Sequence, residues 1–142
     1  MKAQEELSKI LIENAVIDSK LEELAHLNAL ATRVTAAMDS EVVSRTRNTD
    51  TMADTIAKII TMQDEINRLI DSYVDRKAHF SRIIDSLNSP TQIRVLYGHY
   101  YFGKSFQQIA DEIGYSRRNI CYIHGDALRA VEKIMESNNV FP

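Results

Sequence analysis

An apolar residue recurs every three or four positions over residues 52–87, and this pattern constrains the fold more than any other feature of the chain. Nine of its eleven positions are apolar, and they are Met52, Ile56, Ile59, Gln63, Ile66, Ile70, Tyr73, Lys77, Phe80, Ile84 and Leu87. Alternating steps of four and three place such residues along one face of an α-helix. The pattern therefore predicts a long amphipathic helix that packs against another helix.

A second seam of the same kind precedes the first, in a stretch of residues 4–38 without Gly or Pro. Its positions are Ala3, Leu7, Ile10, Asn14, Ile17, Leu21, Leu24, Asn28, Ala31, Thr35 and Met38, and Leu11, Leu27, Leu30 and Val34 widen it. Asn14 and Asn28 have two interpretations: buried polar residues that set register or oligomeric state, or residues at an exposed edge.

The polar stretch of residues 39–50, DSEVVSRTRNTD, interrupts the periodicity and is predicted to connect the two helices. Asp50 or Thr51 would cap the start of the second helix. The simplest arrangement is an antiparallel hairpin whose helices are each about 50 Å long. Because two helices alone form a thin core, we expect the hairpin to dimerise or to pack on the rest of the chain. A ligand site in it would need converging acids or histidines, and His26 is isolated.

Composition favours an all-α protein, because the 142 residues include only four Gly and two Pro. No apolar run is long enough to span a bilayer, and the acidic N-terminus does not resemble a secretory signal. The lone Cys121 has no partner for an internal disulfide, and no Cys/His group has zinc-site spacing. We expect a cytoplasmic protein without membrane contact, metal or cofactor.

Residues 88–142 contain several helix start and stop signals. Ser89 and Pro90 suit the start of a third helix, and Gly103 suits its end. Ser105 and Ser116 each stand one residue before a helical run, as N-caps do. The last helix is predicted over residues 117–137. The chain therefore divides into a helical hairpin, residues 1–88, and a C-terminal module, residues 89–142.

Within that module, residues 106–123, FQQIADEIGYSRRNICYI, have the spacing of a helix-turn-helix motif. Such a motif needs a small residue where its helices cross and a turn residue that tolerates positive φ. Ala110 meets the first demand and Gly114 the second. The apolar residues that would hold the second helix on the first are Ile109, Ile113, Ile120 and Ile123.

The exposed start of the second motif helix would enter the major groove of DNA. The predicted DNA-binding residues are Lys104, Gln107, Ser116, Arg117, Arg118, Asn119, Cys121 and Tyr122. Arginine bonds guanine edges bidentately or pairs with phosphate. The alternatives are a solvated arginine pair, a capping role for Asn119 and core-edge packing for Tyr122. Asp111 and Glu112 are expected to point away from the groove, and His124 is expected to be structural.

Charge gives weaker support for DNA binding. Residues 1–87 carry eleven Lys and Arg against fifteen Asp and Glu, and residues 88–142 carry six against five. Nucleic-acid binding modules are usually strongly basic. Any DNA contact must therefore come from a local cluster of basic residues.

The stretch of residues 96–134 resembles region 4 of sigma-70 factors, which reads the −35 promoter element. The chain is more similar still to a phage-associated, sigma-region-4-like family, largely uncharacterised and related to phage late-transcription regulators. The shared pattern comprises Tyr100, Gly103, Ile109-Ala110, Gly114-Tyr115-Ser116 and His124 before Ala127-Leu128. The resemblance extends through residues 20–35 and 52–77. His99 stands where the family has Arg, Phe106 where it has Trp, and Tyr122 where a basic residue is common.

The leading hypothesis is a phage or prophage transcriptional regulator that binds double-stranded DNA sequence-specifically, with the hairpin forming a dimer or contacting a partner. One alternative is a protein-interaction adaptor that acts on RNA polymerase, which the resemblance implies because sigma region 4 also binds polymerase. Another is a DNA-packaging protein similar to a small terminase subunit. An enzyme is not expected, because the sequence has no phosphate-binding loop, no nucleophile with a base and no metal spacing.

Overall fold

The computed structural model describes residues 1–40 and 45–140, with side chains for residues 1–33, 36 and 50–138. Every regular element in these ranges is a helix, in agreement with the expected all-α class. The elements are α1 (Lys2–Ser40), α2 (Arg45–Asp85), α3 (Pro90–Leu96), η1 (Tyr97–Tyr101), α4 (Phe106–Ile113) and α5 (Arg117–Val140). None of the described helices combines the length and the apolarity that crossing a bilayer requires.

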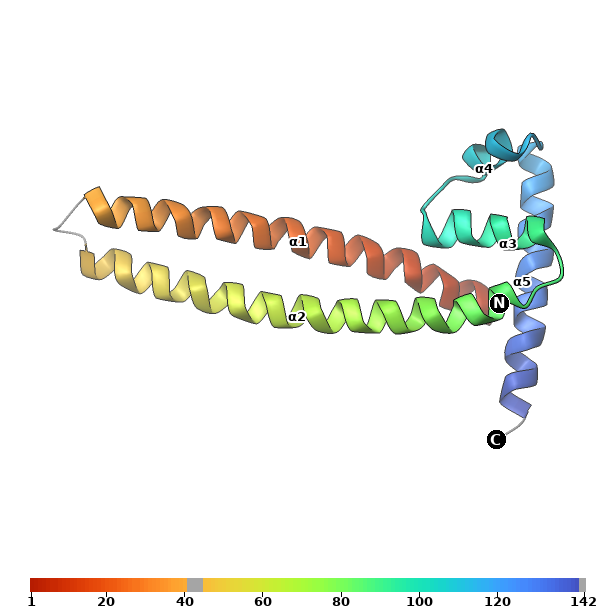
Figure 1. Ribbon diagram of the computed structural model, residues 1–142, viewed down its shortest axis with the longest axis horizontal. Helices are drawn as coiled ribbons and strands as arrows, with labels where there is room; N and C mark the ends of the chain where they lie inside the picture. Colours follow the sequence, from red (N-terminus) through yellow and green to blue (C-terminus); the bar gives the residue numbers. More distant parts are fainter. Residues whose placement is uncertain (41–44, 141–142) are drawn as a thin grey trace. The chain divides into compact units, whose positions relative to one another are not determined.

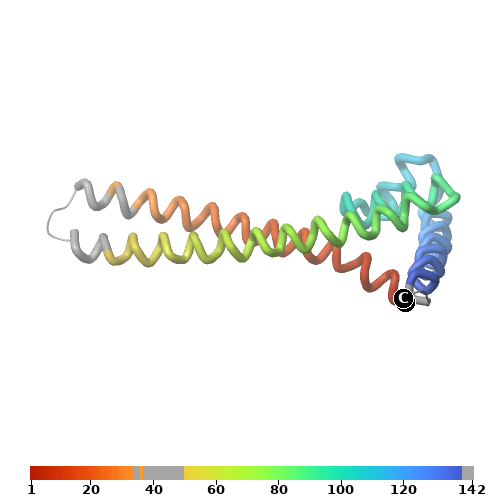
Figure 2. The backbone as a smooth tube through the Cα atoms, turned by 60° about the horizontal axis from the view of Figure 1, so that its bottom comes forward, coloured from red at the N-terminus to blue at the C-terminus, as the bar shows by residue number. Residues whose placement is uncertain are grey.

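Two compact units make up the chain. One, the arm, is Asn14–Ser72 and holds most of α1 and α2; the other, the head, is Met1–Glu13 with Tyr73–Pro142. In the arm the two helices run antiparallel and side by side (Figures 1 and 2). Ile17, Ile59 and Ile66 are buried between them. The predicted pair of long helices is thus present. Its described core is a single row of buried isoleucines between the two helices.

The seam in the arm deviates from the predicted heptad positions. Asn14 and Asn28 are exposed, as is Gln63, while Leu21 and Ile56 are 44% and 41% exposed. Half-buried Leu24 of the predicted seam lines the contact together with Leu27 and Met62, which lie beside the predicted positions. A straight α-helix drifts by about 20° per heptad relative to a strict seven-residue repeat, so the buried face moves to neighbouring positions. The side chains of Thr35 and Met38 lie outside the described residues.

The connection between α1 and α2 is shorter than the predicted residues 39–50. The prediction that Asp50 or Thr51 caps the start of α2 is wrong. α1 continues to Ser40 and α2 begins at Arg45, so Asp50 and Thr51 lie inside a helix. Residues 41–44 of the predicted connection lie outside the described residues. Polar residues alone do not stop a helix, and this stretch has no Gly or Pro to do so.

The head has a larger core than the arm. Its members come from the start of α1, the end of α2, α3, η1 and α5, and they are Ala3, Leu7, Ile10, Phe80, Ile83, Ile84, Leu96, Tyr100, Ala127, Leu128 and Val131. At its edge Arg76 of α2 bonds both Glu6, at 2.9 Å, and Glu13, at 2.7 Å. The two ends of the long helices therefore pack in the same core as α3 and α5.

The predicted boundaries of α3 and α4 are confirmed. The Ser89 hydroxyl accepts a hydrogen bond from the Gln92 amide, Pro90 opens α3, and Gly103 has φ +67° after the helical run. The sequence does not indicate that α3 continues into the wider turn of η1. At Gly98 in η1 a Cβ would lie 3.3 Å from the Ile109 side chain, so this glycine lets η1 approach α4 closely.

Candidate nucleic-acid interface

The start of α4 is held by a capping box at Ser105. The Ser105 hydroxyl accepts from the Gln108 amide at 3.1 Å, and the Gln108 side chain accepts from the Ser105 amide at 2.8 Å. This reciprocal pair satisfies two amides that the helix itself leaves without partners. Ser105 was predicted as an N-cap, whereas the role of Gln108 was not recognised although it stands at the third helical position.

A short turn joins α4 to α5. Gly114 has φ +83°, a left-handed conformation that favours glycine, and its amide bonds the Ala110 carbonyl at 2.9 Å. The Ser116 hydroxyl then accepts from the Asn119 amide at 3.1 Å and caps α5. The predicted roles of Gly114 and Ser116 in local structure are confirmed.

α4 and α5 share a small core of their own with α3. Its buried members are Val95, Ile109, Ala110 and Ile120, and Phe106, Ile113 and Ile123 pack against them. The four isoleucines that were predicted to hold the two helices together all belong to this cluster. Burial of Ile120 on α5 forces the residues on the opposite side of its first two turns toward solvent.

A second contact, which spacing did not reveal, ties α5 to η1. His124 on α5 is buried, and its Nε2 lies 2.6 Å from the Tyr100 hydroxyl. His99 bonds the Lys104 carbonyl at 2.9 Å through Nδ1, and its ring centroid lies 5.7 Å from that of His124. The Phe106 ring packs on both histidines, with centroids at 4.5 and 4.7 Å. These four rings connect η1, α4 and α5.

Burial keeps Tyr100 and His124 of this ring cluster uncharged. It raises the pKa of Tyr100 to about 12. It also lowers the pKa of His124 to about 4, and the neighbouring His99 adds to this shift because two imidazolium charges would repel. His124 is therefore neutral near pH 7 and acts in packing and hydrogen bonding, as expected from the sequence.

The exposed face of α5 carries four of the predicted residues. Arg117, Arg118, Cys121 and Tyr122 are all exposed, and Tyr122 is 60% so. Arg118 donates a hydrogen bond to the Tyr122 hydroxyl at 3.3 Å and lies over its ring, 5.7 Å from the centroid. Within the described part of the chain neither arginine has an acidic partner. Two positive charges thus stand side by side at the start of the helix.

The remaining predicted residues differ in whether their polar groups already bond other residues of the chain. Ser116 and Asn119 are exposed, although the Ser116 hydroxyl is used for capping. Lys104 forms an ion pair with Glu112 at 3.1 Å, and Gln107 donates to Asp111 at 2.9 Å. Asp111 and Glu112 were expected to point away from this surface, yet they hold the two polar groups that α4 and its loop would offer to a phosphate.

Nothing in this region suggests metal chemistry, because the described residues contain no group of three His, Cys, Asp or Glu side chains able to hold an ion. The lone thiol of Cys121 is free and exposed. The surface combines two cations that have no acidic partner in the described ranges, an aromatic ring and short polar groups on one helix end.

Residues 33–132 match the model of a family described as "Protein of unknown function (DUF1492)". The chain belongs to this family. The match covers the end of α1, all of α2 to α4, and α5 through the core residue Val131. No curated protein matches the chain, and no solved structure does. The DUF1492 match therefore spans part of the arm as well as the candidate interface.

Proposed function

We propose that this DUF1492 protein is a sequence-specific DNA-binding transcriptional regulator of phage or prophage origin, which acts in the cytoplasm through a helix-turn-helix formed by α4 and α5. The observation that carries the proposal is the pair of exposed arginines at the start of α5, which have no acidic partner among the described residues. The first residues of a recognition helix are those that contact base edges. The resemblance of residues 96–134 to sigma region 4 points to the same helix.

The local construction supports this assignment. Ile120 and His124 face the core, so Arg118 and Tyr122 lie on the opposite face, and Arg117 and Cys121 are exposed beside them at the start of the helix. The Tyr122 ring limits the conformations of the Arg118 side chain, which reduces the entropy lost when a guanidinium binds a guanine or a phosphate. In this proposal Arg117 and Arg118 contact the groove, and Ser116 and Asn119 contact the backbone or a base nearby.

The proposal is tested by selecting bound fragments from host and phage DNA at near-physiological salt. Wild type is compared with Arg117→Ala/Arg118→Ala. The matched control is Arg129→Ala/Lys133→Ala, which removes two charges from exposed positions farther along α5. We expect wild type and control to enrich the same site and the first variant to lose at least about tenfold in affinity. Equal binding by all three proteins would show that this surface is not the reader.

A second candidate, an adaptor that binds RNA polymerase, is favoured by the ion pair of Lys104 with Glu112 and by the bond of Gln107 to Asp111. These contacts reduce the number of groups free for phosphate. An adaptor predicts no fragment enrichment and copurification with polymerase, lost in the same Arg117→Ala/Arg118→Ala variant. The salt dependence separates the two functions, because several phosphate contacts make DNA affinity fall steeply with salt.

A further inference from the structure

The two sides of the arm differ sharply in charge. Along α2, the residues just before the buried or half-buried positions 55, 59, 62, 66 and 69 are Asp54, Lys58, Thr61, Glu65 and Arg68. The residues just after these positions are Ile56, Ile60, Gln63, Asn67 and Ile70. Steps of three and four keep each set on its own side of the helix. We call the first set the charged stripe.

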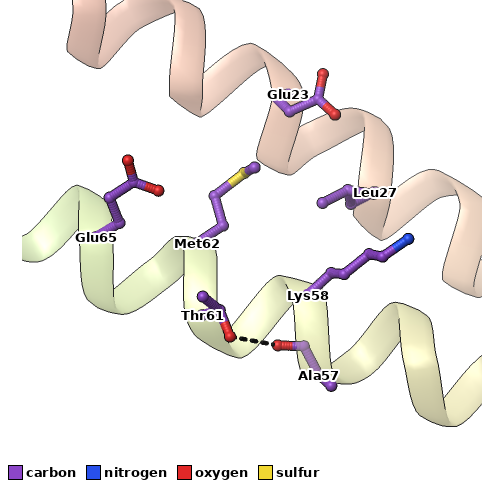
Figure 3. A pocket seen from close by; sticks show the side chains of 7 residues that line it. All are labelled: Glu23, Leu27, Ala57, Lys58, Thr61, Met62 and Glu65. Carbon is purple, nitrogen blue, oxygen red and sulfur yellow. Dashed lines mark hydrogen bonds between the residues drawn. The ribbon is translucent and has the colours of Figure 1, made fainter.

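Beside the charged stripe lies a groove between α1 and α2. Its volume is about 460 Å³, and it is lined by Glu23, Leu27, Ala57, Lys58, Thr61, Met62 and Glu65. Figure 3 shows Leu27 and Met62 facing each other across the groove while Lys58 extends along its edge. The groove thus has an apolar floor with acids and a lysine at its rim.

The charged stripe is complementary to itself when it is reversed. Read from residue 54 to 68, its signs are minus, plus, neutral, minus and plus. A second copy that runs antiparallel, with a two-fold axis at Thr61, places Asp54 opposite Arg68 and Lys58 opposite Glu65. Every charge then meets the opposite sign, twice over, because a two-fold contact repeats each pair.

The side chains of the stripe are available for these pairs. In the described part of the chain Asp54, Lys58 and Arg68 are exposed and have no ion-pair partner. Glu65 bonds Lys20 at 3.0 Å, but its side chain remains 45% exposed and a carboxylate accepts a second cation. The Thr61 hydroxyl already donates to the Ala57 carbonyl at 3.0 Å, so on the axis it needs no further partner.

We propose that the arm is a homodimer interface in which two copies pair antiparallel through the charged stripe of α2. The apolar floor of Leu27 and Met62 is then covered by the second copy, and the Lys58–Glu65 pairs set the register. This interface does not depend on DNA binding. It refines the proposed regulator by giving it two-fold symmetry, the symmetry that palindromic operators match.

The opposite side of the arm is the alternative contact surface. Leu21, Ile56 and Ile60 are 44%, 41% and 54% exposed there. That side contains no pattern that distinguishes a second copy from any other apolar partner. The charged stripe does, because complementary charges select a partner and fix its register.

The test is the mass of the full chain in solution, measured by light scattering after size exclusion, without DNA. Wild type is expected to be a dimer. Lys58→Glu places two acids opposite each other on both sides of the two-fold axis, and Glu65→Lys places two cations there. Each single variant is expected to weaken dimerisation by about tenfold or more.

Two combinations make the test specific. An equimolar mixture of the Lys58→Glu and Glu65→Lys proteins brings opposite charges together again, so a heterodimer is expected. The double variant Lys58→Glu/Glu65→Lys exchanges the partners and is expected to dimerise with itself. Glu22→Lys, a charge reversal at an exposed residue outside the stripe and the groove, is the control and is expected to remain dimeric.

Three results would overturn the proposal: a monomeric wild type, single variants that dimerise as well as wild type, or single variants that stay monomeric when mixed. Loss of the dimer in Ile60→Glu alone, with the charge variants unaffected, would assign the contact to the opposite side. Circular dichroism checks that each variant is helical. Because no DNA is present, failure here leaves the DNA-binding proposal standing, and the reverse also holds.

Discussion

The arm and the head share the two long helices, yet they bury their residues to different depths. Among the described side chains of the arm the most buried are Ile66, Ile17 and Ile59, at 3%, 7% and 9% exposure. In the head Leu7, Leu96 and Ile120 are fully buried. Two helices cover only one face of each other, whereas three or more enclose a side chain from all directions. The number of packed elements, rather than the apolar content of the helices, decides how much of each residue leaves water.

Removal of one buried side chain from each core compares the two units directly, and the change in the head should have the largest effect. Leu96→Ala in the head leaves a cavity among side chains from several helices, and we expect the free energy of unfolding to fall by about 2–5 kcal/mol. Ile59→Ala in the arm is expected to cost only about 2 kcal/mol, because two helices enclose that side chain from fewer directions and its site can collapse. Chemical denaturation measures the totals, and hydrogen exchange shows which unit opens. Equal costs would mean that the two cores are equally tight.

A smaller effect is expected at the turn of the head. Gly114→Ala forces a side chain into a left-handed conformation and should cost about 1–2 kcal/mol, although no atom would clash with the new Cβ. Gly125→Ala is the matched change inside α5, where alanine is the better helix former, and it should stabilise by up to about 1 kcal/mol. Thermal unfolding of both variants checks the opposite signs. Stabilisation by both would contradict the strained turn.

Acid is expected to lower the free energy of unfolding of the head below about pH 6.5, the ordinary pKa of histidine, and to have no such effect above it. Because burial lowers the pKa of His124 to about 4, the unfolded chain binds its proton first as the pH falls. The head should therefore lose stability progressively between about pH 6.5 and 4. His124→Gln should flatten that loss. His26, in the arm, is exposed, so His26→Gln serves as the control. An unchanged pH dependence in His124→Gln would show that this imidazole is not the group responsible.

Much of the local structure could be read from single residues. Ser105, Ser116 and Gly114 act at helix ends through their own hydroxyl groups or backbone freedom, so their roles follow from sequence position alone. The same holds for the core isoleucines of α4 and α5, because helical spacing places them on one face. The DNA-binding role of Arg117 and Arg118 rests on that spacing and stays a prediction.

Other features could not be read from spacing, because they depend on residues distant in the chain. The ring cluster forms only because η1 lies against α5, which brings Tyr100 within 2.6 Å of His124. Lys104 and Gln107 are predicted from the sequence to contact DNA. In the folded chain their side chains instead bond Glu112 and Asp111. The exposure of Asn28 and Gln63 likewise followed from how far the two helices rotate along their contact.

The sequence by itself determined that this chain is helical, where most of its helices begin and end, and which residues of α4 and α5 face each other. These are local properties, set by backbone preference and by the 3.6-residue period of the helix. Only the tertiary structure decided that the ends of the long helices share a core with α3 and α5, and which polar groups remain unpaired at the surface. Such outcomes depend on contacts between distant residues, and no local pattern encodes the geometry in which those residues meet.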